Sequence, residues 1–523
     1  MSHLFHLTPT ERVQFSLWKN LSKTLILPAD ANSETEEWHM KMKSLKEIEK
    51  ILENLQKAGF EGYIVGGCVR DLIMGLKPKD WDVTTNAKPE ELQKIFPESF
   101  YENDFGTVGV KTDSKDSTLK VIEVTTYRTE SEYTDKRHPG KVRFAEKLED
   151  DLKRRDFTIN ALAMDADGKI TDLFGGENDI KSKIVKAVGN AEERFNEDAV
   201  RMMRAVRFAA TLGFQMEIKT LEAIRKHHGL LQAISKERIR DELIKIINSA
   251  DAYKGIDLLR ETELLKYVLP ELLEGIGIGQ NKHHIYNVWE HNLLSLKYAC
   301  DKDYSAEVKL AALFHDVGKP KSKSGEGPDS TFYGHEAIGA RMTARALDRL
   351  KFPKNQAEKI IKLVRYHLFY YNPGEVTESS VRRLVANIGK ENVEDLIKVR
   401  EADRIGSGVP KARPYKLRHL QFMIDKVARD PISPKMLKLN GNDVMKLLNI
   451  QAGPKVGMII AALMNEVLDA PEKNTKKCLE KRAQELNGLS EKELATLGSQ
   501  GKEKMTKEEE KEVEKIKEKY YVE

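Results

Sequence analysis

The sequence predicts a chain of several domains, in which a small α/β domain with a mixed sheet precedes a series of all-helical domains. Its 523 residues are too many for one hydrophobic core, so two to four domains are expected. Between residues 63 and 128, segments with the period-two pattern of strands alternate with short helical patterns. From residue 219 onward, one amphipathic helical pattern follows another, which indicates helical domains.

Composition limits the class of protein and its partners. The chain is 33% charged with a formal net charge of +4, so an RNA partner would be bound by local basic patches. The three cysteines, Cys68, Cys300 and Cys478, are far apart, which argues against a disulfide framework. Their spacing predicts that the protein is located in the reducing cytoplasm. The N-terminus lacks the pattern of a signal peptide, and no segment approaches 18 apolar residues, so we expect neither secretion nor a membrane span.

A glycine pair lies between a short apolar strand and a helix near the start of the chain. Residues 1–43 have no clear period, and a helix with a serine cap is predicted from residue 44. Gly66 and Gly67 follow the predicted strand and allow the backbone to approach a phosphate at a helix N-terminus. Arg70, one turn into that helix, is placed to bind a phosphate oxygen.

Two acidic residues follow in "DWDVTT", which has the alternation of a half-buried strand. In such a strand Asp80 and Asp82 share one face, while Trp81 and Val83 share the other. Adjacent carboxylates repel each other unless cations lie between them, and they suit a site with two Mg²⁺ ions about 4 Å apart. The alternative is a surface turn with an exposed acidic edge, which the preceding glycines and Arg70 make less favoured.

The combination "GGCVRD…KDWDVTT" resembles the signature of the DNA polymerase β-type nucleotidyltransferase superfamily. In detail it is similar to the class II tRNA CCA-adding enzymes and the bacterial poly(A) polymerases, and the resemblance extends from about residue 45 to about residue 410. It implies a polymerase β-like head followed by a helical neck, body and tail, with Mg²⁺ in the head. The resemblance also makes Glu123, in a predicted strand, the third catalytic carboxylate beside Asp80 and Asp82; a solvated strand residue is the alternative.

A polar segment follows this strand at residues 129–144 and includes Asp135, Arg137, His138 and Pro139. It is too long for a tight turn, and we expect a loop. The resemblance implies that this loop is flexible and helps the active site to switch from CTP to ATP. Its presence therefore favours addition of the full CCA end or of A.

The motif "RRDFTINALA" begins with Arg154, Arg155 and Asp156. A capped helix start with a salt bridge is one explanation of these charges. An arginine and an aspartate can also donate to and accept from a ribose 2′-hydroxyl, which distinguishes ribonucleotides from deoxyribonucleotides. The resemblance assigns Arg155 and Asp156 to the sugar, with Arg154 as a weaker candidate.

Residues 191–214 are predicted to form one strong helix with acidic residues first and arginines later. Helix-dipole complementarity and a Glu197–Arg201 pair would explain this order. Asp198 and Arg201 share a face, where the carboxylate can accept from an exocyclic amino group and the guanidinium can donate to a ring nitrogen. Cytosine and adenine match this pair, whereas guanine and uracil leave it mispaired. The resemblance assigns base selection to Glu197, Asp198 and Arg201, and we include Arg204 in the nucleotide site.

A second group of polar residues is distributed over five predicted helical segments. Imidazole and carboxylate ligands together suit a divalent transition metal such as Ni, Mn, Co, Fe or Zn. The set resembles the signature of HD phosphohydrolases and implies hydrolysis of 2′-nucleotides and 2′,3′-cyclic phosphates. The candidate ligands are His291, His315, Asp316, His335, His367 and Asp403. His283 and His284 stay unassigned.

These observations together predict an enzyme that transfers CMP and AMP from CTP and ATP to the 3′ end of tRNA. The alternatives are a poly(A) polymerase, an enzyme that adds only A, and an HD phosphohydrolase with a vestigial head. The oligomeric state is left open. The expected parts are an extension (1–43), the head (44–185), a neck and body (186–275), an HD domain (276–408), an RNA-contacting tail (409–490) and a charged helix or disordered segment (491–523).

Overall fold

A computed structural model describes residues 46–103, 106–133, 139–281, 285–369, 371–428 and 437–522. It divides into two compact units with a boundary between Arg194 and Phe195, and each unit is described separately below. The predicted extension at 1–43, the loop residues Asp135, Arg137 and His138, and the pair His283 and His284 all lie outside the described residues. No helix in the described part of the chain is long and apolar enough to span a bilayer.

The first unit is built on a seven-stranded mixed sheet, which confirms the predicted fold class. The strand order is β3-β4-β5-β2-β1-β8-β9, and β2 runs parallel to β5 while the other neighbours are antiparallel. The central position of β2 explains why its residues after Asp82 are buried. The strands are β1 (Tyr63–Val65), β2 (Asp82–Thr85), β3 (Ser99–Asn103), β4 (Thr107–Lys111), β5 (Val121–Thr126), β8 (Leu162–Met164) and β9 (Ile170–Asp172).

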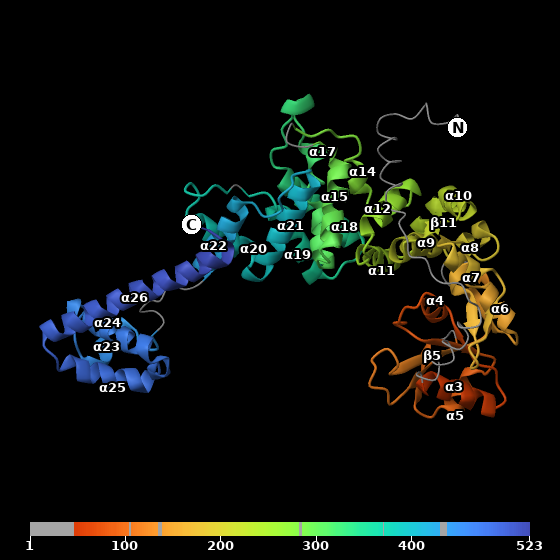
Figure 1. Cartoon of the computed structure of the whole chain (residues 1–523), viewed down its shortest axis with the longest axis horizontal. Coiled ribbons are helices and arrows are strands. Elements are labelled where there is room, and N and C mark those ends of the chain that lie inside the picture. The colour runs from red at the N-terminus through yellow and green to blue at the C-terminus, as the bar shows by residue number, and fades with distance from the viewer. Residues whose placement is uncertain are drawn as a thin grey trace. The chain divides into compact units, whose positions relative to one another are not determined.

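Short helices accompany this sheet (Figure 1). The predicted amphipathic helix is α3 (Lys46–Lys57), whose apolar residues are buried at intervals of three and four. After β1, α4 (Gly67–Ile73) ends two residues before Gly75, which has the left-handed conformation common just after a helix. The other helical elements are α5 (Pro89–Ile95), α6 (Leu148–Lys153), the 3₁₀ turn η1 (Thr158–Asn160) and α7 (Gly176–Lys181), followed by the two-residue strand β10 (Ile184–Val185).

The loop prediction for residues 129–144 is wrong on both of its arms. β6 (Arg128–Tyr133) pairs antiparallel with β7 (Pro139–Phe144) and forms a separate two-stranded sheet. Both arms contain the β-branched and aromatic residue types that favour strands, for example Thr129 and Phe144. Polarity alone therefore misidentified a hairpin as a loop.

The single helix predicted for residues 191–214 is broken in two. α8 (Ala191–Glu197) ends before Asp198, and α9 (Val200–Leu212) begins after it. The cause is local, because Asp198 Oδ1 accepts a hydrogen bond from the backbone N–H of Val200 at 3.1 Å. Such a bond offers the backbone an alternative to the helical ladder, and α9 then begins with Ala199 as its N-cap.

The second unit is almost entirely helical, as predicted. After β11 (Gln215–Met216), short helices precede a bundle in which α15, α16 and α21 meet through small residues, Ala299, Ala312 and Ala402. The helical elements up to the tail are α10 (Ile218–His227), η2 (His228–Ala233), α11 (Lys236–Ile247), α12 (Ala252–Glu261), α13 (Leu265–Val268), α14 (Pro270–Leu273), α15 (Val288–Asp301), α16 (Ala306–Phe314), α17 (Lys319–Ser322), η3 (Gly327–Asp329), α18 (His335–Arg349), α19 (Lys354–Tyr366), α20 (Glu378–Ile388), η4 (Lys390–Asn392), α21 (Val393–Gly406) and α22 (Tyr415–Ala428).

The charged C-terminal segment forms the helix α26 (Glu491–Tyr520), but it is not a lone solvated helix. Leu494 packs into the core formed by α23 (Gly441–Leu448), α24 (Pro454–Asp469) and α25 (Lys476–Asn487). At its other end, Ile516 packs against Phe422 of α22. A few apolar residues at the two ends of the helix therefore outweigh its charged composition.

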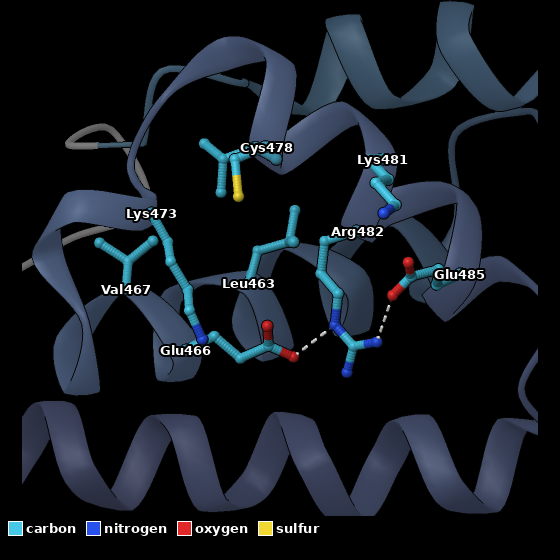
Figure 2. A pocket seen from close by; sticks show the side chains of 9 residues that line it. Leu463, Glu466, Val467, Lys473, Cys478, Lys481, Arg482 and Glu485 are labelled. Carbon is cyan, nitrogen blue, oxygen red and sulfur yellow. Dashed lines mark hydrogen bonds and ion pairs between the residues drawn. The ribbon is translucent and has the colours of Figure 1, made fainter.

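An open pocket of about 490 Å³ lies between α24 and α25 (Figure 2). Arg482 spans it and donates to Glu466 and Glu485, at 2.7 Å in each case. Cys478 is exposed at this pocket, whereas Cys68 and Cys300 are buried. None of the lining residues belongs to a predicted site.

Candidate functional sites

The glycine turn of the head brings the backbone close to two charged side chains. Gly66 has a φ of 87°, a conformation that favours glycine. A Cβ atom there would lie 2.8 Å from Nη1 of Arg155 and 3.6 Å from Oδ2 of Asp82. Gly66 is therefore required both by its conformation and by the space that these two side chains occupy.

The predicted placement of both aspartates on one strand is wrong, because β2 begins only at Asp82. Asp80 is exposed in a bend after Pro78, which has no N–H for a ladder hydrogen bond. Asp82 is paired in register with Glu123 across the parallel strands. Burial raises the pKa of Asp82, the Arg155 guanidinium lowers it and the Asp80 carboxylate raises it further. The repulsion expected between the aspartates is thus present, although they are not on one strand.

Arg70 is buried at 8% exposure and held by two partners. Its Nε and Nη2 donate to Asp71 Oδ1, and its Nη1 donates to Asn160 Oδ1 at 2.6 Å. The predicted phosphate ligand is therefore fixed in position, which reduces the entropy lost when it binds an anion.

The sugar-site candidates depend on a buried carboxylate that we did not predict. Asp151 is fully buried; its two oxygens accept from Arg154 at 2.7 Å and from Arg155 at 3.2 Å. Burial raises the pKa of Asp151, but the two guanidinium groups outweigh this and lower it overall. The signal was present in the sequence, because Asp151 precedes the arginines by three and four residues.

Asn160, also missed, links Asp156 to Arg70. Its amide nitrogen donates to Asp156 Oδ1 at 3.2 Å, and the same oxygen accepts from the backbone N–H of Phe157 at 2.9 Å. Each of the three residues that these hydrogen bonds connect is less than a tenth exposed. The motif "RRDFTINALA" contains Asn160, but its partners come from the fold.

In the second unit, each candidate for base selection has a charged partner. Glu197 Oε2 accepts from Arg201 Nη1 at 2.6 Å, so the expected support of the arginine by Glu197 is present. Asp198 pairs with Arg238 of α11, which donates to both carboxylate oxygens at 3.2 and 2.6 Å. Arg204 lies over the ring of Phe208. Arg238 was not predicted at this site, since nothing in the sequence places it beside Asp198.

The six HD candidates come together in one buried cluster; Asp316 lies in the turn after α16, and the others lie within helices or at their ends. Two groups share Asp316: one contains His291 and His315, and the other contains His335 and His367. Asp316 Oδ2 lies 3.1 Å from His291 Nε2, whereas its Oδ1 lies 3.2 Å from His335 Nε2. Asp403 joins the first group through Oδ1, 3.4 Å from His291 Nε2.

The orientation of these imidazoles fits metal binding. In His315, His335 and His367, Nδ1 lies 2.7 Å from a backbone carbonyl oxygen three residues earlier. In a neutral imidazole, a donated Nδ1–H leaves the Nε2 lone pair directed at the shared aspartate, as is usual for metal-binding histidines. Burial and the charge of His315 lower the pKa of His367 to about 3, whereas at His315 burial is outweighed by Asp316 and Asp403, which raise its pKa to about 10.

Cations flank both carboxylates of this cluster. Lys319 Nζ is 2.6 Å from Asp316 Oδ2, and Arg400 pairs with Asp403 Oδ2. Burial raises the pKa of Asp316, but His315 and Lys319 hold it well below its usual value. The carboxylates therefore stay ionised, and the donor set fits one or two divalent cations.

Three family models match the chain in sequence order. They are the poly A polymerase head domain at residues 62–186, the probable RNA- and SrmB-binding site of polymerase A at 213–275, and the HD domain at 284–406. Head and HD domains of these families imply divalent metals, in agreement with the His/Asp cluster.

Several proteins described as CCA-adding enzymes are similar to this chain. That of Ligilactobacillus salivarius is 48% identical over 223 residues, 42% of this chain and 53% of the relative. That of Lactobacillus delbrueckii is 51% identical over 208 residues, 39% of this chain and 50% of the relative. The chain thus spans about half the length of the curated relatives that it matches.

Solved structures extend the similarity over more of the chain. The Bacillus stearothermophilus CCA-adding enzyme in complex with CTP has a TM-score of 0.53 at 29% identity, covering 84% of this chain and 97% of that one. The Thermotoga maritima enzyme complexed with tRNA has a TM-score of 0.50 at 18% identity, over 86% and 98% of the two chains, and shows the fold alone. The chain thus carries matches to the poly A polymerase head domain, the RNA-binding region of polymerase A and the HD domain, and it is similar to CCA-adding enzymes.

Proposed function

We propose that this protein adds the nucleotides C, C and A to the 3′ end of tRNA, using CTP and ATP. The observation that carries the proposal is the pairing of Asp82 with Glu123 on parallel strands, beside the Gly66 turn and Arg155. The CTP complex of the Bacillus stearothermophilus relative supports CTP as a substrate. The free thiols of all three cysteines agree with a role in the reducing cytoplasm.

In the head, the 3′-hydroxyl oxygen of the RNA attacks the α-phosphorus of the nucleotide, and pyrophosphate leaves. Asp80, Asp82 and Glu123 would hold Mg²⁺, which supplies charge stabilisation at the attacking and leaving oxygens. Arg70 binds a phosphate oxygen from the position fixed by Asp71 and Asn160. Arg155 and Asp156 contact the ribose 2′-hydroxyl, with Arg155 held by Asp151.

Asp198 and Arg201 select the base. Asp198 accepts one bond from Val200 and two from Arg238 within the described structure. Because a carboxylate offers about four acceptor positions, one remains for the exocyclic amino group of cytosine or adenine. Arg201, supported by Glu197, donates to the ring nitrogen. Uracil and guanine present a carbonyl to the carboxylate and a ring N–H to the guanidinium, so both contacts fail.

The HD cluster carries a second proposed activity, hydrolysis of 2′,3′-cyclic phosphate or 2′-phosphate ends of RNA. A divalent Ni, Mn, Co, Fe or Zn ion bound by the cluster would supply a nucleophilic water at neutral pH. Lys319 and Arg400, which flank the carboxylates, bring positive charge for an anionic substrate. This activity would repair damaged ends before nucleotide addition.

Labelled CTP or ATP with tRNA that lacks its 3′ end tests the main activity. Incorporation that stops at CCA supports the proposal. Open-ended A tracts would identify a poly(A) polymerase, and failure to use CTP would identify an enzyme that adds only A. No incorporation of either nucleotide, with hydrolysis of 2′,3′-cyclic nucleotides retained, would identify an HD phosphohydrolase with a vestigial head.

A further inference from the structure

Asn160 connects the proposed phosphate and ribose contacts of the head. Its amide oxygen accepts from Arg70 Nη1 at 2.6 Å, and its amide nitrogen donates to Asp156 Oδ1 at 3.2 Å. The side chain is 6% exposed, and Arg70 and Asp156 are each 8% exposed. One neutral amide therefore contacts a buried cation with its acceptor and a buried anion with its donor.

The backbone that carries Asn160 is held in place from its other side. The backbone N–H of Thr158 in η1 donates to the carbonyl oxygen of Lys186 at 2.9 Å, and that of Asn160 donates to the carbonyl oxygen of Phe157 at 2.9 Å. A Cβ atom at Gly176 would lie 2.2 Å from the Thr158 carbonyl oxygen, so α7 and η1 are in direct backbone contact. Because η1 is packed in this way, a change at Asn160 cannot be absorbed by a simple shift of the turn.

We propose that Asn160 is a positioning residue that holds Arg70 for recognition of the nucleotide's phosphates and Asp156 for recognition of its ribose. This inference rests on the proposed nucleotide site. Because the amide oxygen contacts Arg70 and the amide nitrogen contacts Asp156, each atom positions one of the two side chains. Discrimination against deoxyribonucleotides would then depend on Asn160, although its own side chain binds neither the sugar nor the phosphates.

The two polar atoms of Asn160 can be tested separately. Asn160→Asp keeps an acceptor for Arg70, but it loses the donor to Asp156 and places a second carboxylate beside it. Asn160→Leu has a similar shape and removes both contacts. Thr158→Val is the matched control, because it removes a partly buried side-chain hydrogen bond from the same 3₁₀ turn, one that goes to Asp179 and not to Arg70 or Asp156.

The test is equilibrium binding of CTP, dCTP and CMP to the full chain with Mg²⁺ and without tRNA, together with the melting temperature of each variant. In Asn160→Asp we expect the preference for CTP over dCTP to fall by about 5- to 150-fold, while the preference for CTP over CMP stays near that of the wild type. Asn160→Leu should lose both preferences. Thr158→Val should lower the melting temperature and keep both.

The outcomes distinguish failure of the positioning role of Asn160 from failure of the proposed nucleotide-adding function. If Asn160→Asp keeps the wild-type preference for CTP over dCTP, or loses stability only, as Thr158→Val does, the positioning role is overturned while the nucleotide site stands. If the wild type does not bind CTP, the proposed function itself fails, and the inference fails with it. Should Asn160→Leu not fold, the comparison of Asn160→Asp with Thr158→Val still decides.

Discussion

Asp82 on β2 lies directly opposite Glu123 on β5, because the two strands pair in parallel with these residues in register. Residues in register on neighbouring strands point to the same face of a sheet. Glu123, from a strand about forty residues later, is therefore the neighbour of Asp82 on the sheet itself, whereas Asp80 approaches it from the bend before β2. The three carboxylates thus come from three different backbone environments.

Arg238 is expected to control base selection through Asp198. Replacing Arg238 with alanine removes two hydrogen bonds from the Asp198 carboxylate, which is then free to reorient. We expect the preference for CTP and ATP over UTP and GTP to fall by about 5- to 150-fold, equivalent to about 1–3 kcal/mol. Misincorporation of UTP and GTP into tRNA measures this change.

Arg240→Ala is the matched control on the same helix, because Arg240 pairs with its neighbour Asp241 and not with Asp198. It should leave base selection unchanged. Equal selectivity in the two variants would contradict the role of Arg238.

Asp316 is expected to determine the metal content of the HD cluster, because both groups of ligands share it. Asp316→Asn should lose binding at both positions, whereas His367→Ala should lose only the position that it forms with His335. Metal content after dialysis against Mn²⁺, Co²⁺, Ni²⁺ or Zn²⁺ tests both expectations. His419→Ala is the histidine control, since His419 pairs with Tyr371 outside the cluster. Metal retained at wild-type level by Asp316→Asn would rule out the assignment.

Asp151 is expected to stabilise the head and to make its stability depend on pH. Because its pKa is lowered in the folded protein, its contribution is fully present above the unfolded value of about 3.9 and is lost as pH falls through the folded value. Asp151→Asn removes the carboxylate charge that pairs with the guanidinium groups of Arg154 and Arg155 and should cost about 3–5 kcal/mol near neutral pH. Denaturant unfolding at pH 7 and near pH 3 measures both effects. The difference between wild type and variant should shrink at the lower pH, and an equal difference at both would argue against the ion pairs.

Much of the site could be predicted from local patterns. Period-two alternation located β2 with Asp82, and it located β5, where buried residues alternate with more exposed ones. Glu123 was singled out only by the family resemblance. The HD candidates were selected from residue type, since a histidine followed by aspartate within an apolar helical run is unusual, together with the resemblance to HD phosphohydrolases. Their convergence on one cluster followed from the packing of the helices that carry them.

What could not be predicted depends on contacts between distant segments. Arg238 is forty residues from Asp198, and Asn160 is ninety from Arg70, so no helical or strand spacing connects either pair. The break at Asp198 was missed for a different reason. The helical pattern continues through it, and the bond from its side chain to the backbone of Val200 interrupts the helix.

Replacing Asp82 with alanine tests whether this carboxylate is needed for nucleotide transfer. Both tRNA binding and nucleotide incorporation are measured on the same preparation. In the Asp82→Ala variant we expect tRNA affinity to stay close to that of the wild type, while incorporation of CTP and ATP is abolished. Val121→Thr, an exposed change on the strand that carries Glu123, should keep both properties. Appreciable incorporation by the Asp82→Ala variant would contradict the account.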